Sequence, residues 1–306
     1  MIQTPMDVLR EFPVRKTRRQ KKQFIEAVQS YGQHLGYRVK VEDGAWKTRN
    51  VVLGDPETAR YLITAHYDTP AMLWGTNLMM PCNGVMNALC MALNFLTLMI
   101  PALFLGGAAL YLTGEPLYGC LTLLGAVAVS VLLMMFGIPN PGNANNNTSG
   151  VIALLEIAAS MPQNLRSRVC FVFFDGEQVA LTGSAAYRAK HPAASRIQTV
   201  LNMNCVGDGD TIMFFPGKAM AEDVDLLCLE RSCGDKRVKI HREGKSGDVS
   251  DHLGFERGVG IMALRSGKLG YWLGRTRTCW DNKLEYTNIN ILRACLITYI
   301  SSHTAE

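Results

Sequence analysis

Residues 171–178 read Phe-Val-Phe-Phe-Asp-Gly-Glu-Gln, an apolar run that ends on a glycine, an acid and an amide. The run belongs to a predicted buried strand, Arg168–Phe174, so Glu177 and Gln178 lie just past the end of that strand. His66 and Asn204 likewise follow predicted strands. Because functional sites gather at the carboxyl ends of parallel strands, these side chains are expected to converge on one pocket.

Strand and helix patterns alternate on both sides of this run, which predicts an α/β fold with a mostly parallel central sheet flanked by helices. The expected strands are Tyr37–Val41, Asn50–Leu53, Arg60–Thr64, Arg168–Phe174, Thr199–Met203, Thr211–Phe215 and Gly260–Leu264. The expected helices are Thr17–Leu35, Thr148–Ser160, Gly183–Lys190, Ala219–Ser232 and Asn288–Ser301.

Four strings at these positions resemble the metal-binding strings of the zinc exopeptidases of metallopeptidase family twenty-eight, which include leucyl aminopeptidases and relatives of glutaminyl cyclase. The strings are His66-Tyr-Asp68, Asn143-Ala-Asn-Asn-Asn-Thr-Ser-Gly150, Gly176-Glu-Gln178 and Asn202-Met-Asn-Cys-Val-Gly207. Weaker matches are Leu181-Thr-Gly-Ser184, Ser250-Asp-His-x-x-Phe255 and Arg277-Thr-Cys-Trp-Asp281, the last similar to the family's His-Thr-x-x-Asp. The resemblance implies a zinc-exopeptidase-like sheet from about Thr17 to the C-terminus.

The resemblance also implies a role for each position of the site. In the family, two zinc ions are held by two histidines, two aspartates and a glutamate, while a second glutamate is the general base. Carried onto this chain, the general base is Glu177, His66 is the only retained ligand, and Asp68 orients its imidazole. Asp251 and His252 would lie in the pocket or behind it. The degenerate ligand positions are Asn146, Gln178, Asn204 and Arg277.

Amides in place of carboxylates change the chemistry expected of this site, because an amide lacks the charge that zinc prefers in its ligands. The expected cofactor is therefore none, or zinc if the site is active. One hypothesis places the Arg277 guanidinium in the metal position, bonded to the amide oxygens and to Asp68 or Glu177. Simpler alternatives stay open: His66 as a structural strand-end histidine, Asn145–Asn147 as a loop capping the next helix, and Glu177 as a buried acid paired with Arg277.

Between Asp68 and Glu156 the only charged residue is Glu115, and two apolar runs, Val85–Leu112 and Leu117–Ile138, fill that stretch. Each is long enough to cross a bilayer, which predicts an inserted transmembrane helical hairpin at residues 85–138. The alternative is a pair of buried core helices. On the first interpretation, the peptidase-like domain is discontinuous and comprises residues 1–84 and 139–306.

The hairpin loop carries no cation, whereas Arg15–Lys22 carries six, so the positive-inside rule predicts an integral membrane protein with both termini and the soluble domain in the cytoplasm. The bilayer is thus an expected partner, and the basic run either touches anionic headgroups or forms a solvated first helix turn capped by Thr17. Asn87 and Asn94 share one helix face and are expected to hydrogen-bond across to the second helix.

Composition narrows the function further. The net charge is +5, and no basic stripe with interleaved aromatics, zinc finger or phosphate loop is present, so no nucleic-acid partner is expected. Nine scattered cysteines and an N-terminus without an apolar leader favour reduced thiols in the cytosol. Three functions follow: a pseudopeptidase that binds a peptide, an amine or a partner protein near the membrane; an active metallo-exopeptidase with an atypical metal site; or a membrane scaffold.

Overall fold

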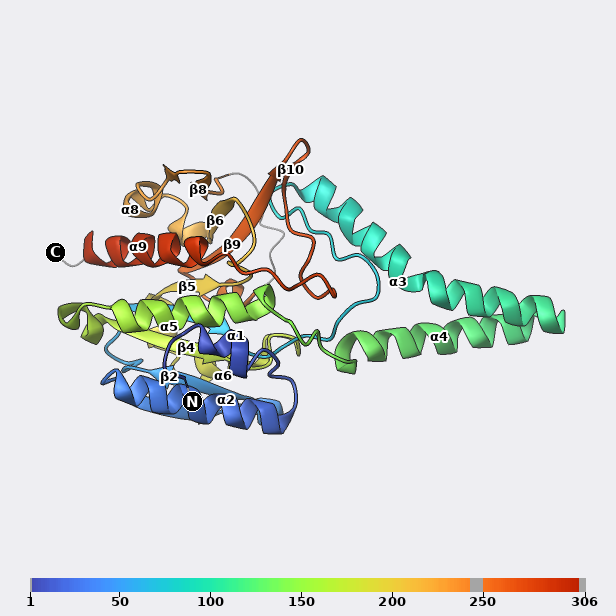
Figure 1. The fold of residues 1–306 in the computed structure, drawn as a ribbon, viewed down its shortest axis with the longest axis horizontal. Helices are drawn as coiled ribbons and strands as arrows, with labels where there is room; N and C mark the ends of the chain where they lie inside the picture. Colours follow the sequence, from blue (N-terminus) through green and yellow to red (C-terminus); the bar gives the residue numbers. More distant parts are fainter. Residues whose placement is uncertain (1, 243–249, 303–306) are drawn as a thin grey trace.

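The computed structural model describes residues 2–242 and 250–302, which form a mixed sheet covered by helices, with a long helical arm projecting from it (Figure 1). The strands are β1 Val39–Asp43, β2 Arg49–Leu53, β3 Tyr61–His66, β4 Val169–Phe174, β5 Thr199–Met203, β6 Thr211–Pro216, β7 Arg231–Cys233, β8 Lys236–Ile240, β9 Gly258–Gly267 and β10 Gly270–Trp272. The helices are α1 Asp7–Glu11, α2 Arg18–His34, α3 Gly84–Thr113, α4 Pro116–Phe136, α5 Gly150–Ser160, α6 Thr182–Lys190, α7 Ala194–Ile197, α8 Val224–Leu227 and α9 Tyr286–Ser302.

The sheet is mixed rather than mostly parallel. Its order is β1-β2-β4-β3-β5-β9-β6-β8-β7, with β10 paired to β9. The four central strands β4, β3, β5 and β9 are parallel to one another, while β2 against β4 and β6 against β9 are antiparallel. The prediction of a mostly parallel sheet was therefore right for the centre, where helices cover both faces. It was wrong toward the edges, where every pair except β6 and β8 is antiparallel and short hairpins join β1 to β2 and β7 to β8.

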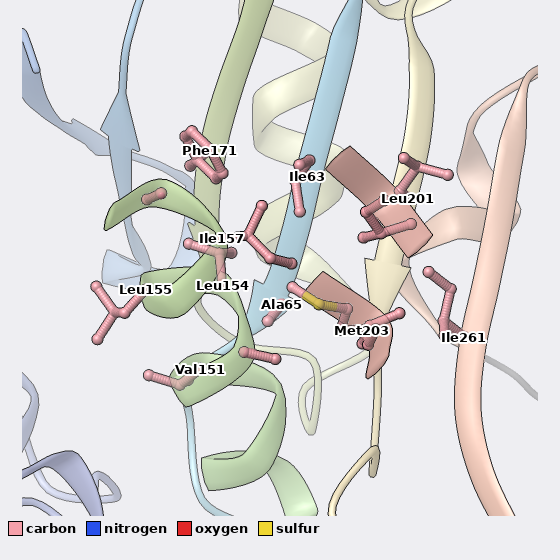
Figure 2. Packing of buried hydrophobic residues seen from close by; sticks show 14 of the residues in the cluster. Ile63, Ala65, Val151, Leu154, Leu155, Ile157, Phe171, Leu201, Met203 and Ile261 are labelled. Atoms are coloured by element: carbon pink, nitrogen blue, oxygen red, sulfur yellow. The ribbon is translucent and has the colours of Figure 1, made fainter. Parts of the chain in front are cut away.

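Alternation along the central strands separates the core into two layers. In β4, Phe171 and Phe173 face a large cluster with α2, α5 and α9, whereas Val172 and Phe174 face a smaller one with Tyr187 of α6. Helix α5 is buried along almost its whole length and packs against the middle of the sheet, as Figure 2 shows. This central position fixes the start of α5, and with it the preceding Asn145–Ser149 turn, beside the ends of β3 and β5.

One predicted helix is wrong. Residues 219–232 were expected to be helical, but the structure has only the short α8 there, and Arg231–Cys233 forms β7. Strand β7 turns into β8 at Gly234, whose φ of +66° suits a glycine-based hairpin turn. The buried apolar residues of this segment, Met220, Leu226 and Leu229, reach the core from a 3-10 turn, from α8 and from the turn after it instead of from one long helix face.

The apolar runs form two helices that are long and apolar enough to cross a membrane. In the most apolar 18-residue windows of α3 and α4, 22% and 11% of the residues are buried, so the alternative of two buried core helices does not describe them. Helix α4, with 21 residues, measures about 31 Å at 1.5 Å per residue. The two helices lie together at the far end of the arm and diverge toward the domain (Figure 1).

The asparagines of α3 were expected to hydrogen-bond to α4, but they bond to a loop of the domain instead. The Asn94 side chain accepts a hydrogen bond from Leu78 N (2.9 Å) and donates one to Leu78 O (2.8 Å), and Asn87 Oδ1 accepts from Met80 N (2.9 Å). An irregular loop has unpaired backbone groups, and these amides satisfy them at the foot of α3. They therefore attach the arm to the domain.

Gly106 of α3 and Gly119 of α4 lie where the two helices touch. A Cβ at Gly106 would lie 2.9 Å from Leu123 Cβ and 3.2 Å from Gly119 O. Gly106→Ala is therefore expected to destabilise the arm by about 1–3 kcal/mol through overpacking. The measurement is the thermal unfolding of the detergent-solubilised protein, followed by circular dichroism.

Gly107→Ala is the matched control, because a Cβ there meets nothing within 4 Å. Both variants gain the same helix propensity, about 1 kcal/mol, so their difference isolates the contact between the helices. Equal melting temperatures for the two variants would contradict this packing.

Arg15 is not part of a surface basic run. Its side chain is fully buried, donates to Tyr67 O (2.6 Å) and to Thr148 Oγ1 (3.1 Å), and also bonds to Phe12 O. Arg18, Arg19 and Lys22 remain exposed at the start of α2, where Thr17 forms a capping box with Gln20. The first cation of the run thus holds the N-terminal segment against the loop that precedes α5.

Candidate functional site

The carboxyl ends of β3, β4 and β5 bring the predicted site residues together. His66 is the last residue of β3, Glu177 and Gln178 follow β4, and Asn204 follows β5. The Asn145–Ser149 turn brings Asn146 to the same edge of the sheet.

His66 is fully buried between two carboxylates. Its Nε2 atom forms an ion pair with Glu177, and its Nδ1 atom lies 3.3 Å from Asp68 Oδ1. Asp68 in turn accepts hydrogen bonds from the backbone N–H of Glu177 (3.2 Å) and of Gln178 (3.1 Å). The three side chains therefore form one line of charges, Asp68–His66–Glu177, that also fixes the backbone of the loop after β4.

This arrangement stabilises the imidazolium. Burial alone would lower the pKa of His66, but the charge of Glu177 and the contact with Asp68 outweigh burial and raise it well above the usual value. Burial alone would raise the pKa of Asp68, yet the hydrogen bond and charge of His66, together with Lys21, lower it to about 2. At neutral pH His66 is therefore positively charged and Asp68 negatively charged.

A cavity of about 340 Å³ opens above this line of charges, and we call it the site cavity. Its polar lining is Asn77, Asn146, Glu177, Gln178, Asn204, Thr276 and Arg277. Gln178 Nε2 donates to Glu177 Oε2 (3.2 Å), and Asn204 Nδ2 lies 3.5 Å from Glu177 Oε1. Asn146 Oδ1 is buried and has no hydrogen-bond partner among the described residues.

The guanidinium hypothesis expected Arg277 to bond to the amide oxygens. Arg277 does line the site cavity, but it does not form those hydrogen bonds. Its Nη2 atom donates to Met134 O (3.2 Å) near the end of α4, and Lys16 Nζ donates to Met135 O (3.1 Å). The last carbonyls of a helix have no partner within the helix, so two cations cap them here. Burial lowers the pKa of Arg277, while nearby Glu177 opposes that shift.

Asp251 and His252 lie behind the site cavity rather than among its lining residues. Burial, together with the charge of Glu177, raises the pKa of Asp251 to about 7. Burial lowers the pKa of His252 to about 4, and its ring lies against the backbone of β9 at Gly260. Ser250, to which the sequence assigned no role, donates to Glu177 Oε1 (3.3 Å) and accepts from Asn202 Nδ2 (2.9 Å).

The donor set does not fit a two-zinc centre. Among residues 2–242 and 250–302, no three His, Cys, Asp or Glu side chains lie together as metal ligands. The Nε2 atom of His66 is paired with Glu177, and Asn146, Gln178 and Asn204 supply neutral amides that are weak ligands for zinc. Arg277 adds a positive charge where the resemblance expects a neutral imidazole.

Strained backbone gathers around the same cavity. Ala180, Leu181, Cys205 and Arg277 all line it, and all have φ between +55° and +60°. In the described chain, only Trp46 and Lys47 share this conformation among non-glycine residues. A left-handed conformation at such residues costs about 1–3 kcal/mol each and commonly marks functional sites. Sequence patterns gave no signal for Ala180, because an alanine predicts no turn.

The fold resembles solved zinc-dependent exopeptidases and glutaminyl cyclases. The LapA aminopeptidase of Legionella pneumophila shares 12% identity at a TM-score of 0.59, over 99% of this chain and 70% of that one. A Zn-dependent exopeptidase from Parabacteroides distasonis shares 16% identity at a TM-score of 0.59, over 97% of this chain and 94% of that one. Porphyromonas gingivalis glutaminyl cyclase shares 16% identity at a TM-score of 0.58, over 98% of this chain and 96% of that one. Identities this low establish the fold alone, and no curated protein matches the sequence.

The sequence itself matches the model of peptidase family M28 over residues 130–281, about half of the chain. That span contains Asn146, Glu177, Gln178, Asn204 and Arg277. His66 and Asp68 precede the helical arm in the sequence, and the structure brings them to the same site. By this match and by its fold, the chain belongs to peptidase family M28.

Proposed function

We propose that this M28 member is a membrane-anchored pseudopeptidase that binds a peptide, an amine or a partner protein in its site cavity. The observation that carries the proposal is the buried ion pair between His66 and Glu177. The imidazole nitrogen that would bind zinc and the carboxylate that would activate water form an ion pair with each other. With amides at the neighbouring positions, the cavity offers hydrogen bonds and shape rather than two-metal hydrolysis.

The strained residues favour a binding site over a scaffold. Ala180, Leu181, Cys205 and Arg277 hold left-handed conformations around one cavity, at a free-energy cost that a mere platform does not require. Asn146 also lines this cavity, and its buried Oδ1 atom has no hydrogen-bond partner among the described residues. The Glu177 carboxylate and the amides in the cavity wall suit a ligand that carries N–H donors, such as a peptide N-terminus or an amine.

The arm supports the membrane part of the proposal. Its length matches the hydrocarbon core of a bilayer, about 30 Å, and its tip presents Tyr111 and Tyr118, which are exposed. At its foot Trp74 and Trp280 are exposed as well, so aromatic residues stand at both ends of the apolar stretch. The foot also carries Lys16 and Arg277, whereas the tip has only Glu115 as a charged residue. This distribution supports a domain on the cytoplasmic side of the membrane.

Ligand protection tests the proposal. Amino-acid amides and short peptides at saturating concentration are expected to raise the melting temperature of the detergent-purified protein by about 5 °C. Glu177→Gln is expected to abolish the shift, because it breaks the ion pair beneath the cavity. Glu256→Gln, at an exposed position away from the site, should keep it. An unchanged shift in the Glu177 variant would contradict binding at this cavity.

A working hydrolase is the second candidate, and the retained carboxylate of Glu177 in the cavity wall favours it. In that case Arg277 would polarise a carbonyl, or a single weakly held metal would do so, while Glu177 activates water. Zinc analysis together with an aminopeptidase assay separates the candidates. Stoichiometric zinc and release of amino acids from amino-acyl amides would overturn the pseudopeptidase proposal.

A further inference from the structure

A second cavity, of about 450 Å³, lies between the foot of the arm and the domain, and we call it the arm cavity. It is lined mainly by apolar side chains of both diverging helices. These are Met91, Phe95, Leu98 and Met99 of α3 with Val127, Val131 and Met134 of α4. Asn77, Met79 and Arg277 line both this cavity and the site cavity, so the two adjoin at Arg277.

The chemistry changes in three steps along this path. The arm cavity is apolar. At the junction, Arg277 and Lys16 carry positive charge, and the Nε atom of Arg277 is buried with no hydrogen-bond partner among the described residues. Beyond it, the Glu177 carboxylate lines the site cavity, with Asp68 on the other side of His66, and Asn146 Oδ1 is an acceptor without a donor among the described residues.

Other polar groups of the arm cavity are already satisfied and need no ligand. Asn94 and Asn87 bond to the backbone of Leu78 and Met80, and Thr76 Oγ1 donates to Asn94 Oδ1 (2.9 Å). These contacts attach the foot of the arm to the domain. Among the described residues that line the two cavities, the buried polar atoms without a hydrogen-bond partner are Arg277 Nε and Asn146 Oδ1.

We infer that the two cavities together bind one aminophospholipid with a phosphoethanolamine head. One acyl chain lies in the arm cavity, the phosphate lies at Arg277 with Lys16 nearby, and the ammonium group enters the site cavity toward Asn146 and Glu177. The order of apolar, positive and negative surroundings matches the order of acyl chain, phosphate and ammonium. This inference rests on the proposed function, since it names the amine that the site binds and places the arm in a bilayer.

Three single-chain lipids of equal chain length test the head. The probes are lysophosphatidylethanolamine, lysophosphatidylcholine and lysophosphatidic acid, added below their micellar concentrations to the full chain held in amphipol. The ethanolamine lipid is expected to bind at least about tenfold more tightly than the other two, because choline has no N–H and the phosphatidic acid has no ammonium. Arg277→Gln should also weaken binding of the ethanolamine lipid at least tenfold. Native mass spectrometry measures the bound fractions.

Chain length and one paired substitution test the arm cavity. Each added methylene from eight to twelve carbons is expected to tighten binding about fourfold. Val127→Trp fills the cavity and should abolish this dependence, whereas Val129→Trp, on the exposed side of the same helix, should leave it intact. If Val127→Trp does not fold, the chain-length series on the natural protein still decides.

The outcomes separate this inference from the proposed function. Equal binding of the three lipids, or no dependence on chain length, would overturn the inference. If amino-acid amides bind in a Glu177-dependent way while the lipids do not compete, the proposed function stands and the inference falls. If Val127→Trp weakens binding of the ethanolamine lipid but Glu177→Gln does not, the lipid head lies outside the site cavity. That outcome also overturns the inference.

Discussion

Restoring ionisable ligands at four positions of the site cavity is expected to create a zinc site that binds at least about a thousandfold more tightly than the natural chain, a difference of ~4 kcal/mol. Carboxylates and an imidazole supply the donors that zinc requires, and all four positions line one cavity above His66. Equilibrium dialysis in buffered zinc, followed by elemental analysis, measures the affinity. The variant carries Asn146→Asp, Gln178→Glu, Asn204→Asp and Arg277→His.

Without metal, this variant gathers several carboxylates in one buried place, so its melting temperature should be low and should rise steeply with zinc. A control tests the alignment of Arg277 with the second histidine. It carries the same three acids with Arg275→His, in the same loop but paired with Asp208 at 3.7 Å. Equal zinc affinity in the control would show that Arg277 does not occupy the ligand position.

His66→Gln is expected to destabilise the protein by about 3 kcal/mol at pH 7. It leaves Asp68 and Glu177 buried without the positive charge between them, and an unpaired buried charge is costly. Chemical denaturation of the detergent-purified protein measures the loss. His191→Gln, at a histidine that also lies between two carboxylates, Glu42 and Glu57, but nearer the surface, should cost much less.

The pH dependence of this loss has a definite sign. Because the pKa of His66 is raised on folding, its contribution is complete below about 6.5 and disappears as the pH rises through the folded value. Because the pKa of Asp68 falls from 3.8 to about 2, its contribution is complete above 3.8 and disappears as the pH falls toward 2. The difference between the natural chain and His66→Gln should therefore be largest between about pH 4 and 6.5.

A double variant separates the ion pair from a packing effect. Adding Glu177→Gln to His66→Gln removes one of the two unpaired carboxylates, so the double variant should be more stable than His66→Gln alone. Simple additivity of the two losses would mean that the side chains do not interact.

The centre of the fold could be predicted from the sequence because its signals are local. Val169–Phe174 is apolar throughout, since both faces of β4 are covered. His66 ends one of three strands that lie side by side, and Glu177 and Asn204 follow the other two. The antiparallel edges gave weaker signals. Strand β7 has three residues and is largely exposed, so no periodicity marked it.

The partners of the charged residues could not be predicted, because they depend on distant contacts. Nothing near Arg277 in the sequence indicates that its guanidinium reaches Met134, and nothing near Arg15 indicates burial against Tyr67 and Thr148. The four family strings brought His66 and Glu177 to one site, but as ligand and base of a metal. That they pair with each other follows only from the side-chain positions.

The place of the arm in the chain has a consequence for biogenesis. Strand β3 precedes the arm, yet both of its neighbours, β4 and β5, follow it. When the ribosome has made residues 1–84, only the β1–β2 pair can form, and β3 has two open edges. On the membrane placement proposed above, α3 and α4 therefore enter the bilayer before the sheet exists. Insertion of the hairpin therefore precedes folding of the sheet, and the domain folds while it is already anchored to the membrane.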